Sequence, residues 1–117
     1  MREITCSTIT DAIKKMCIEA ATILPQDVEK ALSQKHDEED SALAQKTLQV
    51  LMDNAKLAQE KQMPICQDTG MAFVYVTMGQ EVHITGGSLN EAIQEGVRQG
   101  YTEGYLRKSV VKDPLFE

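Results

Sequence analysis

Seven consecutive residues, 64–70, place a thiol, an amide, a carboxylate and a hydroxyl next to one another, in the order PICQDTG. Cys66 offers a thiol that can act as a nucleophile or as a metal ligand. Gln67 offers a donor and an acceptor of hydrogen bonds, and Asp68 offers an acceptor or a general base. Gly70 allows backbone conformations that other residues avoid. A turn that presents these groups together is therefore a candidate functional site.

The partners that Cys66 would need are not evident from the residue types alone. A nucleophilic thiol requires a base, and the two histidines lie in an acidic segment (His36) and in an expected strand (His83). An iron–sulfur cluster requires three or four thiolates, and residues 64–70 contain one. Composition and spacing therefore predict a site without identifying it, and a turn with a buried thiol explains these residues equally well.

Composition limits the class of protein. With 117 residues, of which 42 % are hydrophobic and 26 % charged, the chain should form one folded domain or part of one. Its net charge of −6 and the lack of a basic stripe argue against nucleic acid as a partner. No apolar run approaches the ~20 residues of a membrane span. The charges of Arg2 and Glu3 argue against an export signal.

The cysteines indicate the redox compartment. Cys6, Cys17 and Cys66 are odd in number and have no C-x-x-C spacing, which argues against a disulfide framework and against a zinc ribbon. We therefore expect a reducing, cytoplasmic location. Cys17 lies on the apolar stripe of an expected helix, so we expect it to be a small core residue.

The elements that position the candidate site begin with two helices. Residues 9–24 carry apolar side chains at the i, i+3, i+4 spacing of an amphipathic helix, which Ser7 or Thr8 can cap. Pro25 should end this helix and open a short second helix around residues 28–32.

A third helix should lead directly into the candidate site. Residues 36–40, HDEED, are typical of a solvated loop. Asp40 or Ser41 can cap the helix that follows. This helix must stop before Pro64, because a proline pushes the residue before it out of the helical region.

The hydrophobic period changes after the candidate site. Residues 71–78, MAFVYVTM, are uncharged and rich in β-branched and aromatic side chains, which is typical of a strand buried on both faces. Gly79 and Gln80 form a plausible two-residue turn into residues 82–84. We therefore expect a β-hairpin here.

A last helix should run from a cap at Ser88 to about Arg107. Gly96, Gly100 and Gly104 recur on it at steps of four residues, and each interior glycine costs roughly 1 kcal/mol relative to alanine. Such a stripe predicts that another element approaches the helix backbone closely. The fold class is then α+β and mostly helical: three N-terminal helices, a β-hairpin and a long glycine-lined helix, as a fragment of a larger domain.

Two ordered motifs of the chain resemble a known family. The PICQDTG run resembles the signature of class I fumarate hydratases, the iron–sulfur-dependent hydro-lyases. Residues 105–111, YLRKSVV, with Asp113-Pro114-Leu115 after them, resemble a second family segment, and residues 90–101 resemble the helix before it. The likeness covers effectively the whole chain, more weakly in the N-terminal helices, at Glu39, Ser41 and Asn54.

The resemblance implies an activity and roles for particular residues. In the family, three cysteines hold a 4Fe-4S cluster that leaves one iron open to bind substrate as a Lewis acid, and Cys66 matches the first of these cysteines. The residues that match Gln67 and Asp68 contact substrate. The arginine that matches Arg107 pairs with a substrate carboxylate, for which a planar guanidinium is well suited. The implied reaction is the reversible hydration of fumarate to L-malate, a step of the TCA cycle.

The chain also departs from the family pattern. No residues match the two further cluster cysteines, a family histidine or the C-terminal domain that supplies the catalytic base, and Cys6 and Cys17 do not match the other ligand positions. We therefore expect residues 1–117 to be an N-terminal piece of the alpha region or alpha subunit. Alone it should be inactive, without a catalytic residue of its own and without the cluster. Its expected partners are the remaining alpha region, a beta subunit or domain, and further copies in a homo-oligomer.

Three other interpretations remain open. The parent enzyme can be an L-tartrate dehydratase or a dehydratase of a related hydroxy-diacid. The chain can be an interaction or dimerisation module that has the fold without the chemistry. A thiol redox protein built on Cys66 is a third possibility, and it requires a thiol pKa well below ~8.5.

Overall fold

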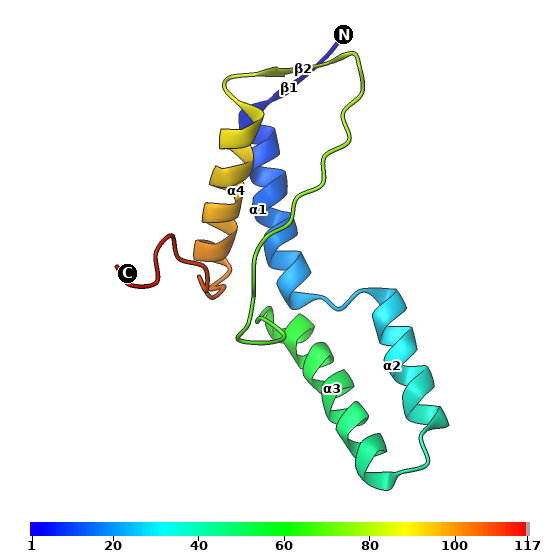
Figure 1. Cartoon of the computed structure of the whole chain (residues 1–117). Helices are drawn as coiled ribbons and strands as arrows, with labels where there is room; N and C mark the ends of the chain where they lie inside the picture. The colour runs from blue at the N-terminus through cyan, green and yellow to red at the C-terminus, as the bar shows by residue number, and fades with distance from the viewer. Residues whose placement is uncertain (117) are drawn as a thin grey trace.

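The computed structural model describes residues 1–116 and confirms a mostly helical α+β architecture (Figure 1). Along the chain the elements are β1 (Arg2–Thr5), α1 (Cys6–Thr22), α2 (Gln26–Glu38), α3 (Ala42–Lys61), β2 (Val82–Thr85) and α4 (Leu89–Glu103). The molecule is elongated, with extents of 56 × 42 × 23 Å. Its radius of gyration is 18.3 Å, whereas a compact chain of this length has about 13 Å.

The glycine stripe of α4 packs against α1, as the sequence predicts. A Cβ on Gly96 would lie 2.6 Å from the Cβ of Ile13, and a Cβ on Gly100 would lie 2.8 Å from the Cβ of Cys17. Both distances are shorter than real Cβ contacts. Residue numbers rise together along the two helices, so α1 and α4 run parallel, side by side in Figure 1.

The prediction of a β-hairpin is wrong. Val82–Thr85 pairs with Arg2–Thr5, in parallel, and residues 71–78 form no strand. The physical reason is the α1–α4 packing. Strand β1 leads directly into α1, and β2 leads into α4 through residues 86–88, so two strands that precede parallel helices also run parallel. The Val82 N–H does donate to the Gly79 carbonyl at 3.2 Å, but this turn directs the chain toward β1.

Helix ends agree with the expected caps at two of the four helices. Ser41 and Ser88 accept the expected hydrogen bonds at the starts of α3 and α4. Helix α1 begins earlier than expected, because the Thr5 hydroxyl accepts the Thr8 N–H at 3.3 Å. Pro25 precedes α2 as its N-cap residue.

Helices α2 and α3 form a hairpin that projects away from the α1–α4 pair (Figure 1). Residues 36–38 belong to α2, so the expectation of a loop over 36–40 is only partly correct. Glu38 accepts hydrogen bonds from Gln34 and Lys35, both at 2.6 Å, which favours helix up to that point.

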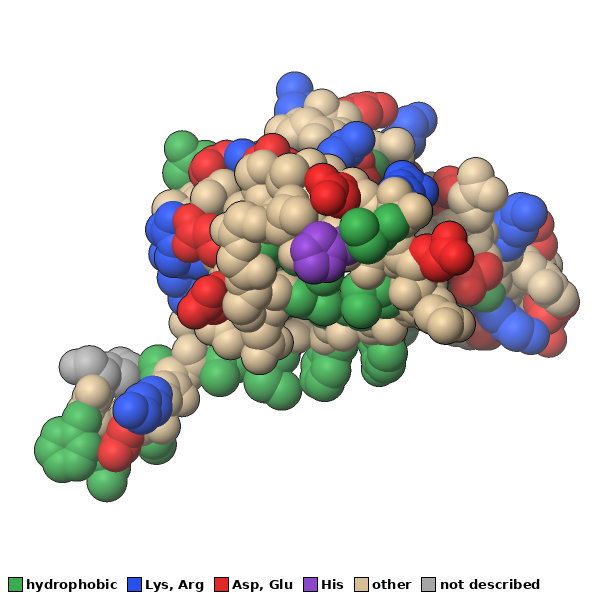
Figure 2. All heavy atoms as spheres, turned by 90° about the horizontal axis from the view of Figure 1, so that it is seen from above, with side chains coloured by type: hydrophobic (Ala, Val, Ile, Leu, Met, Phe, Trp, Pro, Cys, Tyr) green, Lys and Arg blue, Asp and Glu red, His purple; other side chains and the backbone are tan. Residues whose placement is uncertain are grey.

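The buried core is small, and many large apolar side chains are exposed. The buried residues are Ile13, Thr22, Ala55, Ala58, Ala92 and Leu106, with two of the α4 glycines. Figure 2 shows hydrophobic side chains that project in a row from one side of the molecule. Within residues 1–116, none of the helices combines the length and the hydrophobicity of a membrane-spanning helix.

Candidate functional site

Residues 64–70 form a loop that is anchored first through Ile65. The Ile65 N–H donates to the Ala21 carbonyl near the end of α1 at 2.9 Å. The amide of Asn54, on α3, donates to the Ile65 carbonyl at 2.8 Å. Both backbone polar groups of this one residue are therefore satisfied by different helices, which fixes where the loop leaves the α2–α3 hairpin.

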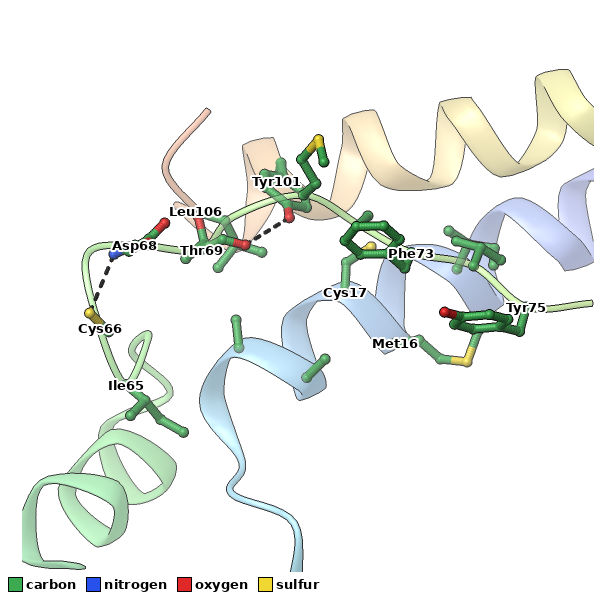
Figure 3. A pocket seen from close by; sticks show the side chains of 16 residues that line it. Met16, Cys17, Ile65, Cys66, Asp68, Thr69, Phe73, Tyr75, Tyr101 and Leu106 are labelled. Atoms are coloured by element: carbon green, nitrogen blue, oxygen red, sulfur yellow. Dashed lines mark hydrogen bonds between the residues drawn. The ribbon is translucent and has the colours of Figure 1, made fainter. Parts of the chain in front are cut away.

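The other end of the loop is anchored on α4 and on the segment after it. The Tyr101 hydroxyl donates to the Thr69 carbonyl at 3.1 Å (Figure 3). The Thr69 hydroxyl donates to the Arg107 carbonyl at 2.8 Å. Because α4 ends at Glu103 and not near Arg107 as expected, the chain turns back toward the loop. Tyr105 makes this turn with a φ of +54°.

A tight turn at Asp68 shapes the middle of the loop. The Asp68 carboxylate accepts the Gly70 N–H at 3.2 Å, and Gly70 has a φ of +56°, which confirms the expected conformational role of this glycine. The Asp68 N–H donates to the Cys66 sulfur at 3.5 Å (Figure 3). Such N–H groups stabilise negative charge on a sulfur ligand.

Cys66, Gln67 and Arg107 line one shallow hollow of about 270 Å³. The other lining residues are Pro64, Thr69 and Tyr105. Arg107 is the one charged residue among them. The Cys66 thiol donates to the Gln67 side-chain oxygen at 3.4 Å. Cys66 is exposed, so a turn with a buried thiol is not the explanation of this motif.

Asp68 is not among the residues that line this hollow, although the sequence places it next to Gln67. It lines a second, larger hollow of about 500 Å³ between the loop, α1 and the segment 71–75. Figure 3 shows this hollow with Phe73 and Tyr75 on one side and Met16 and Cys17 on α1. Its lining is mostly apolar, and Cys66 and Thr69 line both hollows, so the two hollows meet at the loop.

Two of the three thiols, those of Cys17 and Cys66, line the same hollow of about 500 Å³, and Cys6 does not line it. Cys6 donates to the Ser88 carbonyl at 3.7 Å beside the start of α4, whereas Cys17 is half-buried against Gly100. Burial raises the pKa of the Cys17 thiol, as expected of a core residue.

No group of three or more histidine, cysteine, aspartate or glutamate side chains in residues 1–116 is arranged to hold a metal ion. A 4Fe-4S cluster needs at least three protein ligands, and this part of the chain offers the single exposed thiol of Cys66. The described residues therefore do not form a cluster site by themselves.

Two residues, Asn54 and Tyr101, hold the loop 64–70 through hydrogen bonds that the residue pattern does not reveal. Hydrophobic spacing places Tyr101 on the apolar side of the last helix, and nothing in that spacing indicates that its hydroxyl reaches residues 64–70. The resemblance points to Asn54 without giving a reason, and its contact with the Ile65 carbonyl supplies one.

Comparison with known proteins gives the family. The family described as Fumarate hydratase (Fumerase) matches residues 10–117, which is most of the chain and includes both site segments. The chain belongs to the fumarate hydratase family. The family that the PICQDTG and YLRKSVV motifs indicate is thereby confirmed.

Some relatives of this fumarate hydratase family member are named as tartrate dehydratase subunits, and another is named as a fumarate hydratase. A putative L(+)-tartrate dehydratase subunit alpha of Methanocaldococcus jannaschii is 36 % identical over 88 % of this chain and 36 % of its own length. A putative fumarate hydratase class I of Geobacillus stearothermophilus is 31 % identical over 86 % of this chain and 20 % of its own. The L(+)-tartrate dehydratase subunit alpha of Escherichia coli K12 is 26 % identical over 89 % and 34 %. The chain thus spans about a third or less of the length of these relatives.

Proposed function

We propose that this chain is the N-terminal part of a hydro-lyase that reversibly hydrates fumarate to L-malate. In this proposal Gln67, Asp68 and Arg107 bind the substrate, and Cys66 is one metal ligand. Hydration adds a hydroxyl to one carbon of the double bond and a hydrogen to the other, and it consumes no oxidant or reductant. Membership of the fumarate hydratase family supports the reaction class.

One observation carries the assignment of the site. Arg107 lies 41 residues after Cys66 in the sequence, yet both residues line the same hollow together with Gln67. A guanidinium binds a carboxylate through two parallel hydrogen bonds, and an amide can donate to a second acceptor on the same molecule. Because the chain has a net charge of −6, a dicarboxylate needs such a local cation to bind.

The proposal assigns the missing chemistry to polypeptide outside residues 1–117. The other ligands of a 4Fe-4S cluster and the catalytic base would come from the remaining alpha region, and a beta subunit or domain would complete the enzyme. Two relatives are named as alpha subunits, which supports a partner of this kind. Residues 1–117 alone would then be inactive, and we propose a cytoplasmic location for the assembled enzyme.

L(+)-tartrate is the second candidate substrate. The specific reason is that the Methanocaldococcus jannaschii relative named for tartrate is 36 % identical, compared with 31 % for the relative named for fumarate. Tartrate dehydration removes water from a four-carbon dicarboxylate in the same way. The same Arg107 contact would therefore serve either substrate.

Comparing substrates on the assembled protein tests the proposal. The protein would be isolated under anaerobic conditions with its bound partners, and kcat/KM would be measured for fumarate, L-malate and L(+)-tartrate. We expect interconversion of fumarate and L-malate, with tartrate at least about tenfold slower, a difference of ~1.4 kcal/mol in transition-state binding. Faster turnover of tartrate would support the second candidate. No turnover of any of the three by an enzyme with an intact cluster would contradict both.

A further inference from the structure

The guanidinium of Arg107 has no polar partner within residues 1–116. It forms neither a hydrogen bond nor an ion pair with these residues, although Arg107 lines the hollow of about 270 Å³ together with Cys66 and Gln67. The place at which such a guanidinium can bind an anion is set by the backbone that carries it, and a small displacement of a binding group is costly. The contacts that hold the Arg107 backbone are therefore important for binding.

One hydrogen bond connects the backbone of Arg107 to the loop 64–70. The Thr69 hydroxyl donates to the Arg107 carbonyl at 2.8 Å, and the same carbonyl accepts the Ser109 N–H at 3.1 Å. In the part of the chain that the structure describes, the Thr69 bond is the one hydrogen bond between residues 107–116 and any earlier residue. The polar contact of this segment with the rest of the chain thus depends on a single hydroxyl.

Thr69 is itself held by α4. The Tyr101 hydroxyl donates to the Thr69 carbonyl at 3.1 Å, whereas the Tyr101 carbonyl accepts the Leu106 N–H at 3.0 Å. The Leu106 side chain is 5 % exposed, so burial also anchors the residue before Arg107. One tyrosine of α4 therefore holds both the hydroxyl donor and the residue that precedes its acceptor.

We propose that Thr69 is a positioning residue that sets where Arg107 binds a carboxylate of the substrate. This role rests on the proposed function and extends it to a residue that need not touch the substrate. Loss of the hydroxyl frees the backbone after Leu106, so that the guanidinium is no longer fixed relative to Cys66 and Gln67. Because the carboxylate is bound both before and during the reaction, the main effect is weaker binding, which raises KM and leaves kcat nearly unchanged.

Substitutions of Thr69 in the assembled enzyme, isolated anaerobically with its bound partners, test this role. KM and kcat would be measured with whichever of fumarate, L-malate and L(+)-tartrate has the highest kcat/KM. Thr69→Val keeps the size of the side chain and removes the hydroxyl, so it should raise KM by roughly fivefold, with kcat within about twofold of wild type. Thr69→Ser keeps the hydroxyl and should have a KM within about twofold of wild type.

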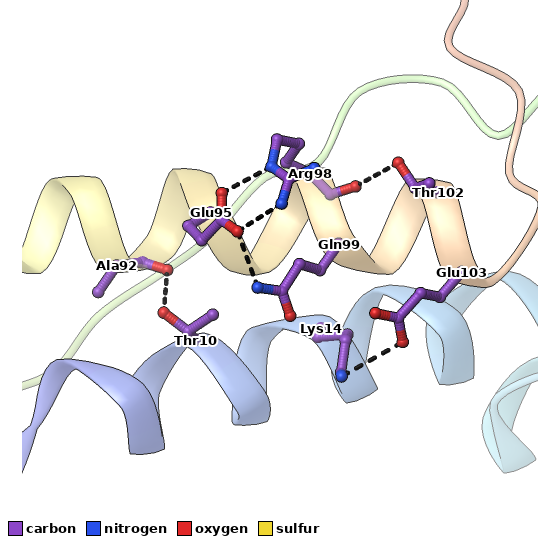
Figure 4. Close-up of polar contacts among 8 residues, drawn as sticks. All are labelled: Thr10, Lys14, Ala92, Glu95, Arg98, Gln99, Thr102 and Glu103. Carbon is purple, nitrogen blue, oxygen red and sulfur yellow. Dashed lines mark hydrogen bonds and ion pairs between the residues drawn. The ribbon is translucent and has the colours of Figure 1, made fainter.

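Thr10→Val is the matched control. The Thr10 hydroxyl also donates to a distant backbone carbonyl, that of Ala92, at 3.0 Å (Figure 4). Thr10 and Thr69 are both half-buried, but Thr10 joins α1 to α4 near the start of each helix, whereas the loop contacts their ends. A loss of stability alone lowers the fraction of folded enzyme, and with it the apparent kcat, without changing KM. Thr10→Val should therefore have the KM of wild type.

A double variant separates positioning of Arg107 from any other role of Thr69. If Thr69 acts through Arg107, adding Thr69→Val to Arg107→Ala should lower kcat/KM by less than about twofold. A further fivefold loss in that background would overturn the role, and so would an equal rise of KM in Thr10→Val. Should Thr69→Val fail to assemble, Tyr101→Phe releases the Thr69 carbonyl and should also raise KM. An unchanged KM in Tyr101→Phe would then overturn the role.

The same measurements distinguish this role from the proposed function. Wild-type enzyme with an intact cluster that turns over none of the three substrates would contradict the function and the role together. Turnover by wild type with an unchanged KM in Thr69→Val would overturn the role alone.

Discussion

The Thr69 hydroxyl donates a hydrogen bond of 2.8 Å to the carbonyl oxygen of Arg107, which joins two residues that are 38 positions apart. One residue belongs to the PICQDTG motif and the other to the YLRKSVV motif. The bond holds the segment after α4 against the loop 64–70. The two motifs that indicate the family are thus in direct contact.

Removal of the Tyr101 hydroxyl should loosen the loop. We expect Tyr101→Phe to lower the free energy of unfolding by about 1 kcal/mol, because the Thr69 carbonyl loses its 3.1 Å hydrogen bond. Urea denaturation measures this change, and hydrogen exchange should show faster exchange at residues 65–70. The control is Tyr105→Phe, since Tyr105 is 90 % exposed and should change stability by less than ~0.5 kcal/mol. Equal effects of the two variants would contradict the anchoring role.

Addition of one methyl group to α4 should separate it from α1. In Gly96→Ala the new Cβ would lie 2.7 Å from the Thr10 carbonyl oxygen, a backbone atom that cannot move alone. Alanine gains about 1 kcal/mol of helix propensity, but the backbone clash outweighs this gain. We expect a net loss of roughly 1–3 kcal/mol of stability by denaturant unfolding. Gly79→Ala is the control, because its nearest contact would be 3.8 Å from the Val82 side chain.

An unchanged stability of Gly96→Ala would contradict this explanation of the glycine stripe. A Gly96→Ala protein as stable as wild type would mean that the two helices can separate at little cost. The close approach of α1 and α4 would then not explain the glycine stripe.

The ion pair on the exposed face of α4 should make stability depend on pH. Hydrogen bonds from Arg98, and then from Gln99, lower the pKa of the Glu95 carboxyl from 4.5 to about 2 (Figure 4). A lowered pKa in the folded state stabilises the protein above the unfolded value of 4.5, and this contribution is lost as the pH falls through about 2. Wild type should therefore melt slightly above Glu95→Gln at pH 7.

Measurement of Tm over a series of pH values tests the contribution of the Glu95–Arg98 pair. The difference in Tm between wild type and Glu95→Gln should shrink between pH 4.5 and pH 2. It should also shrink in high salt, because the pair is exposed. A difference in Tm that is constant over this pH range would mean that charge on Glu95 does not contribute to it.

The local features of the fold can be predicted from the sequence. Caps at Ser41 and Ser88, the end of α3 before Pro64 and the close packing at Gly96 all depend on neighbours a few residues away or on one helix face. Such information is contained in residue spacing. The parallel pairing of Arg2–Thr5 with Val82–Thr85 depends on how α1 meets α4, which no local pattern expresses.

In the candidate site, too, local features can be predicted from the sequence, whereas long-range contacts cannot. The reactive residues of the loop are evident from their types, and the resemblance joins them to Arg107. The spacing does not reveal that Asp68 lines a hollow that Gln67 does not line, because this depends on the turn closed by Gly70. Nor does it reveal the Tyr101 anchor, which requires α4 to pass beside the loop.

The most direct test of the site is substitution of Arg107 in the assembled enzyme. We expect Arg107→Ala to lower kcat/KM for fumarate by roughly thirtyfold or more, equivalent to ~2 kcal/mol, because a carboxylate of the substrate loses its partner. Arg107→Lys should recover part of the loss. Lys108→Ala, a change at the neighbouring exposed cation, should remain within about threefold of wild type. Wild-type kcat/KM in Arg107→Ala, or an effect confined to subunit association, would contradict the proposal that this site binds a dicarboxylate.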